Sequence, residues 1–313
     1  MKDLVLFGDC RKTLPAFIDE ARMCVTSPPY YGLRDYGGEA SQIGMEQSPE
    51  EYIQQLVEVF RLVRDILTDD GTLWVNIGDS YYNYRSDGNY PKQTVSKTRQ
   101  DLPTKTPVRG NKLEGLKSKD LIGIPWMLAF ALRADGWYLR QDIIWHKPNP
   151  MPESVKDRCT KAHEYIFLLS KNKNYYYNNE AIKEPAKDWG TRDRSNGKYH
   201  NPGSGLVPHS GLTKSYERKN KRSVWSVTKK PYKGAHFATF PPDLIEPCIL
   251  AGSEPGDIIL DPFMGSGTTA MVAKQHGRYY MGCELHEDYG ELIKNRVPEE
   301  QPSEQNGLTD LFY

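Results

Sequence analysis

Short apolar runs alternate along most of the chain with longer segments in which apolar residues recur every three or four positions. Short runs bounded by turn-forming residues favour strands, and the longer period favours amphipathic helices. Strands that alternate with helices predict an α/β fold with a mostly parallel sheet. The seven strands we expect are Leu4–Phe7, Met23–Thr26, Thr72–Ile77, Tyr138–Trp145, Tyr165–Leu169, Asp257–Leu260 and Tyr279–Cys283.

The helical pattern is clearest in the segment Pro49–Leu67. Ser48 precedes it as a candidate N-cap, and Tyr52 and Leu56 begin its apolar stripe. The remaining helices that we expect are Ile122–Ala134, Pro241–Leu250 and Thr268–His276. Residues 297–313 are polar and rich in Pro, Gln and Glu, which predicts a loose tail.

The sequence TSPPY, from Thr26 to Tyr30, follows one of the predicted strands directly. Two consecutive prolines remove two backbone donors and fix two φ angles, so this loop is stiff. Its carbonyl groups, with the hydroxyl of Ser27 and the ring of Tyr30, suit a planar ligand that carries an amine, such as a nucleobase. A Pro-Pro turn that buries a tyrosine explains the same residues. The loop alone does not decide between these two interpretations.

A second loop, DPFMGSGTT, follows the predicted strand Asp257–Leu260 and leads into a predicted helix. A strand, a glycine turn and a helix N-terminus together let backbone N–H groups approach a ligand closely. The loop lacks the lysine of a phosphate-binding P-loop. Glu284 ends the next strand, where a carboxylate can bind ribose hydroxyls. An ordinary acid at the end of a strand is the competing interpretation of Glu284.

The formal net charge of zero conceals two basic segments. Residues 83–119 hold nine Lys/Arg against three Asp/Glu, and residues 171–235 hold fifteen against five. Both segments are rich in Gly, Pro, Ser, Asn and Tyr, which predicts long loops outside the core. Basic loops on an acidic body are what contact with a phosphate backbone requires, although solvated surface charge explains the same composition.

Together TSPPY, DPFMGSGTT and GCEL resemble the amino-directed DNA methyltransferases, which use S-adenosylmethionine. The first sequence resembles their catalytic motif and the second their methyl-donor motif. The catalytic motif comes first and a long basic segment separates the two, an order similar to the β group of that family. This resemblance covers nearly the whole chain. It implies a seven-stranded, mostly parallel, Rossmann-like methyltransferase sheet with one antiparallel strand.

The resemblance also implies a division of the chain into regions. Residues 1–150 and 236–296 would form the catalytic domain, residues 151–235 the target-recognition region, residues 83–119 an inserted basic loop and residues 297–313 the tail.

The same resemblance implies roles for individual residues. The catalytic residues would be Ser27, Pro28, Pro29 and Tyr30. Residues that bind S-adenosylmethionine would be Asp9, Thr26, Asp261, Pro262, Phe263, Gly265, Gly267, Thr268 and Glu284. Residues that contact DNA would be Arg192, Arg194, Arg218, Lys219, Lys221 and Arg222.

The chemistry of the catalytic loop follows from its residue types. An exocyclic amine is a weak nucleophile because its lone pair is delocalised into the base. Two acceptors, the hydroxyl of Ser27 and the carbonyl of Pro28, would hold the amine hydrogens and orient the lone pair. Tyr30 would stack on a base flipped out of duplex DNA, a contact worth ~1–3 kcal/mol. Alignment of the methyl group then supplies catalysis by proximity.

The family resemblance also bears on which base is methylated. Serine at the first position of the motif usually accompanies cytosine N4 in this family, so Ser27 favours cytosine, with adenine N6 as the alternative. Methylation at carbon 5 needs a cysteine nucleophile, and Cys248 lies in a predicted core helix. An RNA methyltransferase and a catalytically idle DNA-binding protein are less favoured hypotheses that stay open.

Several classes of protein are disfavoured by composition. The five scattered cysteines contain no C-x-x-C pair, which fits reduced thiols in a cytoplasm. The family resemblance implies a cell or phage of prokaryotic type, with the protein on the nucleoid. No His or Cys spacing suits a metal, and no apolar run is long enough to span a membrane. Duplex DNA is the expected partner. Homodimer formation and a separate cognate restriction endonuclease stay open.

Overall fold

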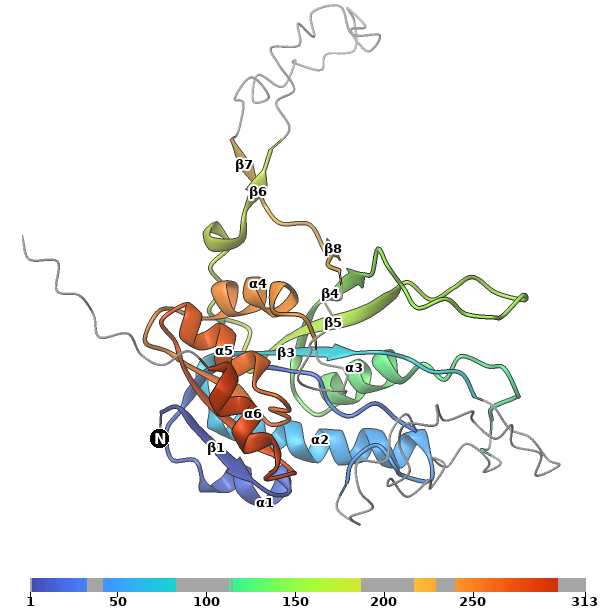
Figure 1. Ribbon diagram of the computed structural model, residues 1–313, viewed down its shortest axis with the longest axis horizontal. Helices are drawn as coiled ribbons and strands as arrows, with labels where there is room; N and C mark the ends of the chain where they lie inside the picture. Colours follow the sequence, from blue (N-terminus) through green and yellow to red (C-terminus); the bar gives the residue numbers. More distant parts are fainter. Residues whose placement is uncertain are drawn as a thin grey trace, which may run out of the picture.

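The computed structural model describes residues 2–32, 42–82, 113, 115–186, 217–228 and 240–297. Its centre is an eight-stranded sheet in the order β1-β10-β9-β2-β3-β5-β4-β8 (Figure 1). Strand β5 is antiparallel to both of its neighbours, and all other strand pairs in this sheet are parallel. The α/β class and the one antiparallel strand are therefore confirmed.

All seven predicted strands are present, with ends that differ by a few residues. The strands of the sheet are β1 (Leu4–Phe7), β2 (Ala21–Thr26), β3 (Leu67–Ile77), β4 (Tyr138–His146), β5 (His163–Ser170), β8 (Val224–Ser226), β9 (Ile258–Asp261) and β10 (Tyr279–Glu284). The number seven was wrong by one, because β8 pairs with β4 at the edge of the sheet. A three-residue strand with one buried residue, Trp225, leaves no periodic signal in the sequence.

Helices cover both faces of the sheet (Figure 1). Short α1 (Cys10–Thr13), long α2 (Pro49–Ile66) and α3 (Ile124–Ala134) pack on one face, and α4 (Pro242–Gly252) and α5 (Thr268–Gln275) on the other. Helix α6 (Tyr289–Arg296) packs beside α5. Of these, α1 and α6 were not predicted from the sequence.

The alternation of side chains along β3 divides the core between the two faces. Leu73 and Val75 join the cluster under α2 and α3, whereas Trp74 joins the cluster under α4. Successive side chains of a strand point to opposite faces, so a strand buried on both faces is apolar throughout. This explains why the strand signal was a continuous apolar run.

Part of the predicted recognition region projects away from the sheet. The two-residue strands β6 (Glu184–Pro185) and β7 (Arg218–Lys219) pair as a separate small ribbon, visible above the sheet in Figure 1. A 3-10 turn, η2 (Glu180–Ile182), precedes the ribbon, and another, η1 (Leu14–Ala16), follows α1. Most of the basic loop 83–119 and almost all of the predicted tail lie outside the described residues.

Candidate active site

The TSPPY loop follows the carboxyl end of β2, in the middle of the sheet. Ser27, Pro28, Pro29 and Tyr30 all line one cavity of about 570 Å³. The hydroxyl of Tyr52, on α2, donates a hydrogen bond of 2.8 Å to the carbonyl oxygen of Pro29. Because prolines donate no backbone hydrogen bond, this contact from a buried helix residue holds the loop in place.

Tyr30 is fixed at both its hydroxyl and its ring. The hydroxyl donates a hydrogen bond of 2.7 Å to Oε2 of Glu164, and the ammonium of Lys147 pairs with the other carboxylate oxygen. Burial, with the negative charge of Glu164 beside it, raises the pKa of Tyr30 well above its usual value. A Cβ on Gly78 would lie 2.7 Å from a carbon of the Tyr30 ring. The ring therefore packs against bare backbone.

The loop DPFMGSGTT, the candidate donor loop, contains two glycines with different surroundings. Gly265 has a left-handed φ of +54°, and among the described residues a Cβ there would meet one atom within 4 Å, so these residues leave its backbone open. Gly267 precedes α5 with φ +80°, and a Cβ there would lie 3.3 Å from Ile293 of α6. Gly265 thus permits close approach of a ligand, while Gly267 permits close packing of α6.

Glu284 lies at the edge of the same cavity, at the end of β10. Its carboxylate accepts hydrogen bonds from the backbone N–H groups of Gly265, at 2.8 Å, and His286, at 3.1 Å. Burial raises the pKa of Glu284 in spite of these two bonds. Asp9 reaches the cavity from the start of α1. Burial opposes ionisation of Asp9, but hydrogen bonds from Arg11 lower its pKa overall.

The buried side chain of Asp261 connects the TSPPY loop to the DPFMGSGTT loop. Its carboxylate accepts hydrogen bonds of 2.6 Å from the hydroxyls of Thr26 and Thr269, and one of 3.0 Å from the backbone N–H of Phe263. The side chain is 1% exposed, and burial raises its pKa to about 6. Thr26 immediately precedes Ser27, so this carboxylate fixes the position of the catalytic loop relative to the donor loop.

The cavity brings together most of the residues that were predicted to be catalytic or to bind S-adenosylmethionine. Those that line it are Asp9, Ser27, Pro28, Pro29, Tyr30, Pro262, Phe263, Gly265 and Glu284. Thr26, Asp261, Gly267 and Thr268 do not line the cavity. Thr26, Asp261 and Thr268 are buried, and the hydrogen bond between Thr26 and Asp261 joins the two loops inside the protein.

Sequence reasoning missed the residues that close the catalytic side of the cavity. They are Asn76, Asp79, Lys147, Lys161, His163 and Glu164, from the end of β3, the region after β4 and the start of β5. Because β5 is antiparallel, its first residues meet the last residues of β3 and β4 at this edge. Polar residues at those strand ends were the available signal.

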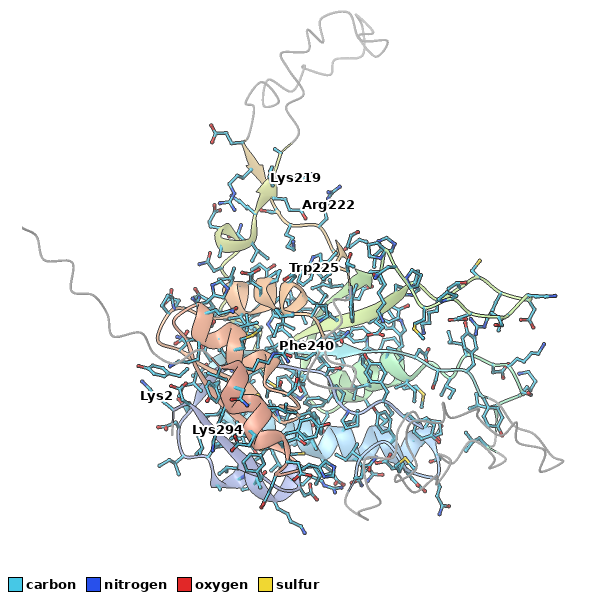
Figure 2. All side chains as sticks on the ribbon, viewed as in Figure 1. Lys2, Lys219, Arg222, Trp225, Phe240 and Lys294 are labelled. Atoms are coloured by element: carbon cyan, nitrogen blue, oxygen red, sulfur yellow. The ribbon has the colours of Figure 1, made fainter. Side chains whose placement is uncertain are left out.

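The predicted DNA-contacting residues fall into two groups. Arg192 and Arg194 lie outside the described residues. Lys219 and Arg222 lie on or just after the projecting ribbon, with Trp225 at its base (Figure 2). Arg218 donates to the carbonyl oxygen of Lys183 at 2.8 Å, and Lys221 and Arg222 pair with Glu184. These contacts stiffen the ribbon and leave Arg222 74% exposed at its side chain.

Two further features bear on the class of protein. No group of three His, Cys, Asp or Glu side chains suited to a metal ion occurs within the described ranges. None of the helices in those ranges is long and apolar enough to cross a membrane.

Comparison with known proteins decides the family. The family model for DNA methylases, which covers the N6 and N4 types, matches residues 21–295. The chain belongs to the DNA methylase family. The methylase is 47% identical over 298 residues to the Type II methyltransferase M.SmaI of Serratia marcescens, covering 94% of this chain and 90% of that one. It is 48% identical over 280 residues to M.Cfr9I of Citrobacter freundii, covering 88% and 81%.

Solved structures show the same fold. The cytosine-N4-specific PvuII DNA methyltransferase superposes with a TM-score of 0.61 at 18% identity, covering 97% of the methylase and 89% of that chain. The M1.HpyAVI–SAM complex superposes with a TM-score of 0.52 at 17% identity, covering 93% and 97%. The methyltransferase fold expected from the sequence is confirmed.

S-Adenosylmethionine is the cofactor of this methylase, and the residues of the cavity fit it. The open backbone at Gly265 lies beside the carboxylate of Glu284, which suits ribose hydroxyls. Nε2 of His286, which also lines the cavity, is buried without a hydrogen-bond partner among the described residues. A ligand with polar groups would satisfy that atom. When bound, S-adenosylmethionine supplies a methyl group on a sulfonium leaving group.

Proposed function

We propose that this methylase transfers a methyl group to the N4 amine of a flipped cytosine in a specific duplex DNA site. One observation carries the proposal: Ser27 and the donor loop line the same cavity. A base must leave the duplex to reach such a pocket. The resemblance of TSPPY to serine-containing amine motifs favours cytosine over adenine.

The residues around Ser27 support activation of an amine. The hydroxyl of Ser27 and the carbonyl of Pro28 accept the two amine hydrogens, which directs the nitrogen lone pair away from the loop. Tyr30, held by Glu164, provides a flat surface for the base. Asp261 keeps this loop in register with the donor loop, so that the reacting atoms are aligned. No covalent intermediate with the enzyme is required.

The projecting ribbon is proposed to take part in recognition of the DNA target sequence. Residues of the projecting ribbon, with Lys219 and Arg222, contact the phosphate backbone beside the target base. The curated relatives are named as Type II methyltransferases. We infer that this chain has the same role, paired with a restriction endonuclease that is a separate protein.

Nucleoside analysis tests the proposal. Duplex DNA is incubated with the enzyme and S-adenosylmethionine, digested and analysed by mass spectrometry, and single-molecule sequencing identifies the site. We expect N4-methylcytosine at one defined sequence. N6-Methyladenine would overturn the choice of base, and activity on structured RNA but not on duplex DNA would overturn the substrate.

Variants of two serines test the role of the loop. Ser27→Ala should reduce turnover by about 100-fold or more while sparing donor binding, because an acceptor for the amine is lost. Ser170→Ala is the matched control, since that hydroxyl binds the carbonyl oxygen of Asn172 at the opposite end of β5. Full activity of Ser27→Ala would contradict the assignment.

A further inference from the structure

The mouth of the cavity carries an exposed apolar side chain, that of Met151. Among the described residues, Met151 is the most exposed large apolar residue, at 83%, and of the large apolar residues exposed there it alone lines the cavity. Single exposed apolar residues are common on protein surfaces, so the exposure alone would carry no meaning. A side chain that both lines a cavity and faces solvent lies where the cavity opens. Met151 therefore lies where a base from outside enters.

Met151 belongs to the loop of residues 147–162, which connects β4 to β5. Figure 1 shows this loop projecting beyond the ends of both strands. Pro150 and Pro152 flank Met151 directly. Each proline fixes its own φ angle and restricts the residue before it, so the backbone at Met151 has few conformations to lose. The loop therefore presents the side chain at a low cost in conformational entropy.

Charged side chains hold the two sides of this loop together. The carboxylate of Glu153 pairs with Arg158 and accepts a hydrogen bond of 3.3 Å from the backbone N–H of Lys161. The guanidinium of Arg158 lies 3.8 Å from the ring centroid of Tyr81, in the segment that follows β3. The loop is thus fixed both within itself and against the neighbouring segment, and Met151 does not depend on a moving part.

The charge of the loop fits a nucleic-acid partner. Residues 147–162 contain four Lys/Arg against two Asp/Glu, and Lys156 is exposed. A net positive loop beside the cavity attracts the phosphate backbone of the DNA that this family methylates. Methionine is among the apolar side chains that proteins insert between base pairs, and its unbranched chain adapts to irregular gaps.

We propose that Met151 is a wedge that enters the base stack of duplex DNA and fills the space left by the flipped target base. The inference rests on the proposed function, in which the target base leaves the duplex. An exposed apolar side chain and an empty place in a base stack are both unfavourable in water, and their contact removes both from water. Val155, also exposed in this loop, lines a separate cavity and is therefore not placed for this role.

Two variants of Met151 test the proposal on a duplex that contains the methylated site. In single-turnover methylation, Met151→Ala should be slower than the wild type by about 10-fold or more, because less of the energy of unstacking is offset. Met151→Leu keeps an apolar side chain of similar volume and should stay within about twofold of the wild type. The free energy of unfolding and the affinity for S-adenosylmethionine should not change in either variant, because the side chain is exposed.

A second duplex separates base flipping from any other role of Met151. A pyrene nucleotide placed opposite the target base fills the stack and leaves no room for that base inside the duplex. On this DNA the base is already displaced, so Met151→Ala should methylate within about twofold of the wild-type rate. Rescue by the DNA itself is not expected if the side chain acts on the base within the cavity.

Ile18 provides a matched control outside the cavity. It is 81% exposed, nearly as much as Met151, and it does not line the cavity. Ile18→Ala should therefore methylate both duplexes at the wild-type rate.

Two outcomes would overturn the proposal: a wild-type rate for Met151→Ala on the ordinary duplex, or an equal loss on both duplexes. The nucleoside formed by the wild type judges the proposed base, whereas the ratios of variant to wild-type rates judge Met151. The pyrene nucleotide is placed opposite whichever base is methylated, so the wedge can be recognised even if that base is adenine.

Discussion

Replacing Asp261 by Asn should change how stability depends on pH. In the folded protein burial raises the pKa of this carboxyl from 3.8 to about 6. An acid with a raised pKa in the folded state contributes stability below its unfolded pKa, and loses that contribution as pH rises through the folded pKa. With 1.36 kcal/mol per pKa unit, the total loss is about 3 kcal/mol above pH ~7. Asn carries no charge at any pH, so the variant does not incur this loss.

The measurement is the free energy of unfolding in urea at about pH 4.5 and about pH 7.5. Most of the carboxyl's titration lies between these values, so the stability of Asp261→Asn relative to the wild type should rise by roughly 2 kcal/mol. Other titrating groups cancel in the comparison because they are common to both proteins. A difference between the two proteins that is the same at both pH values would refute the reasoning.

Three further changes probe other parts of the structure. Glu284→Ala should weaken S-adenosylmethionine binding by about tenfold or more in calorimetry, because it removes a carboxylate at the cavity; wild-type affinity would contradict the donor role. Gly282→Ala places a Cβ 2.8 Å from the carbonyl oxygen of Asp261 and against Met264, so Tm should fall and the free energy of unfolding should decrease by about 1–3 kcal/mol. An unchanged Tm would show that the segment around Asp261 and Met264 can shift to accommodate the methyl group. Trp225→Ala should lower the free energy of unfolding in urea by about 3 kcal/mol, because a buried indole and its 2.7 Å hydrogen bond to the carbonyl oxygen of Arg222 are lost. A decrease below about 1 kcal/mol would show that β8 contributes little to stability.

The sequence was most informative where strands are buried on both faces. The apolar run before Ile77 and the one at Ile259 predicted their strands because parallel sheets leave little room for polar residues. The short strand at Trp225 gave no such signal, since its partner β4 is nearly eighty residues away in the chain. Pairing between strands that are far apart in the chain is decided by tertiary packing.

Some residues of the candidate site could likewise be predicted from the sequence, and others could not. Residues in loop motifs, such as Ser27 and Gly265, were predicted because proline and glycine restrict the backbone visibly in the sequence. Lys147 and Glu164 were missed because each is an ordinary charged residue near a strand end until the antiparallel β5 brings them together. Asp261 was predicted to bind the cofactor, whereas the structure has its carboxylate bonded to the hydroxyls of Thr26 and Thr269.

Strand β8 limits how this enzyme could be given a new target sequence. Its three residues continue the sheet beside β4, and the carbonyl oxygen of Val227 accepts a hydrogen bond of 2.8 Å from the indole of Trp145, a residue of the cavity wall. A graft that replaced everything from 151 to 235 would remove both β8, at the edge of the sheet, and β5, the strand between β3 and β4 that carries Glu164 of the cavity wall. Exchanging only the segment between Pro185 and Arg218, which already face each other across the ribbon, would leave that wall intact. The segment that can be exchanged without disturbing the sheet is therefore smaller than the 151–235 region that the family resemblance implies.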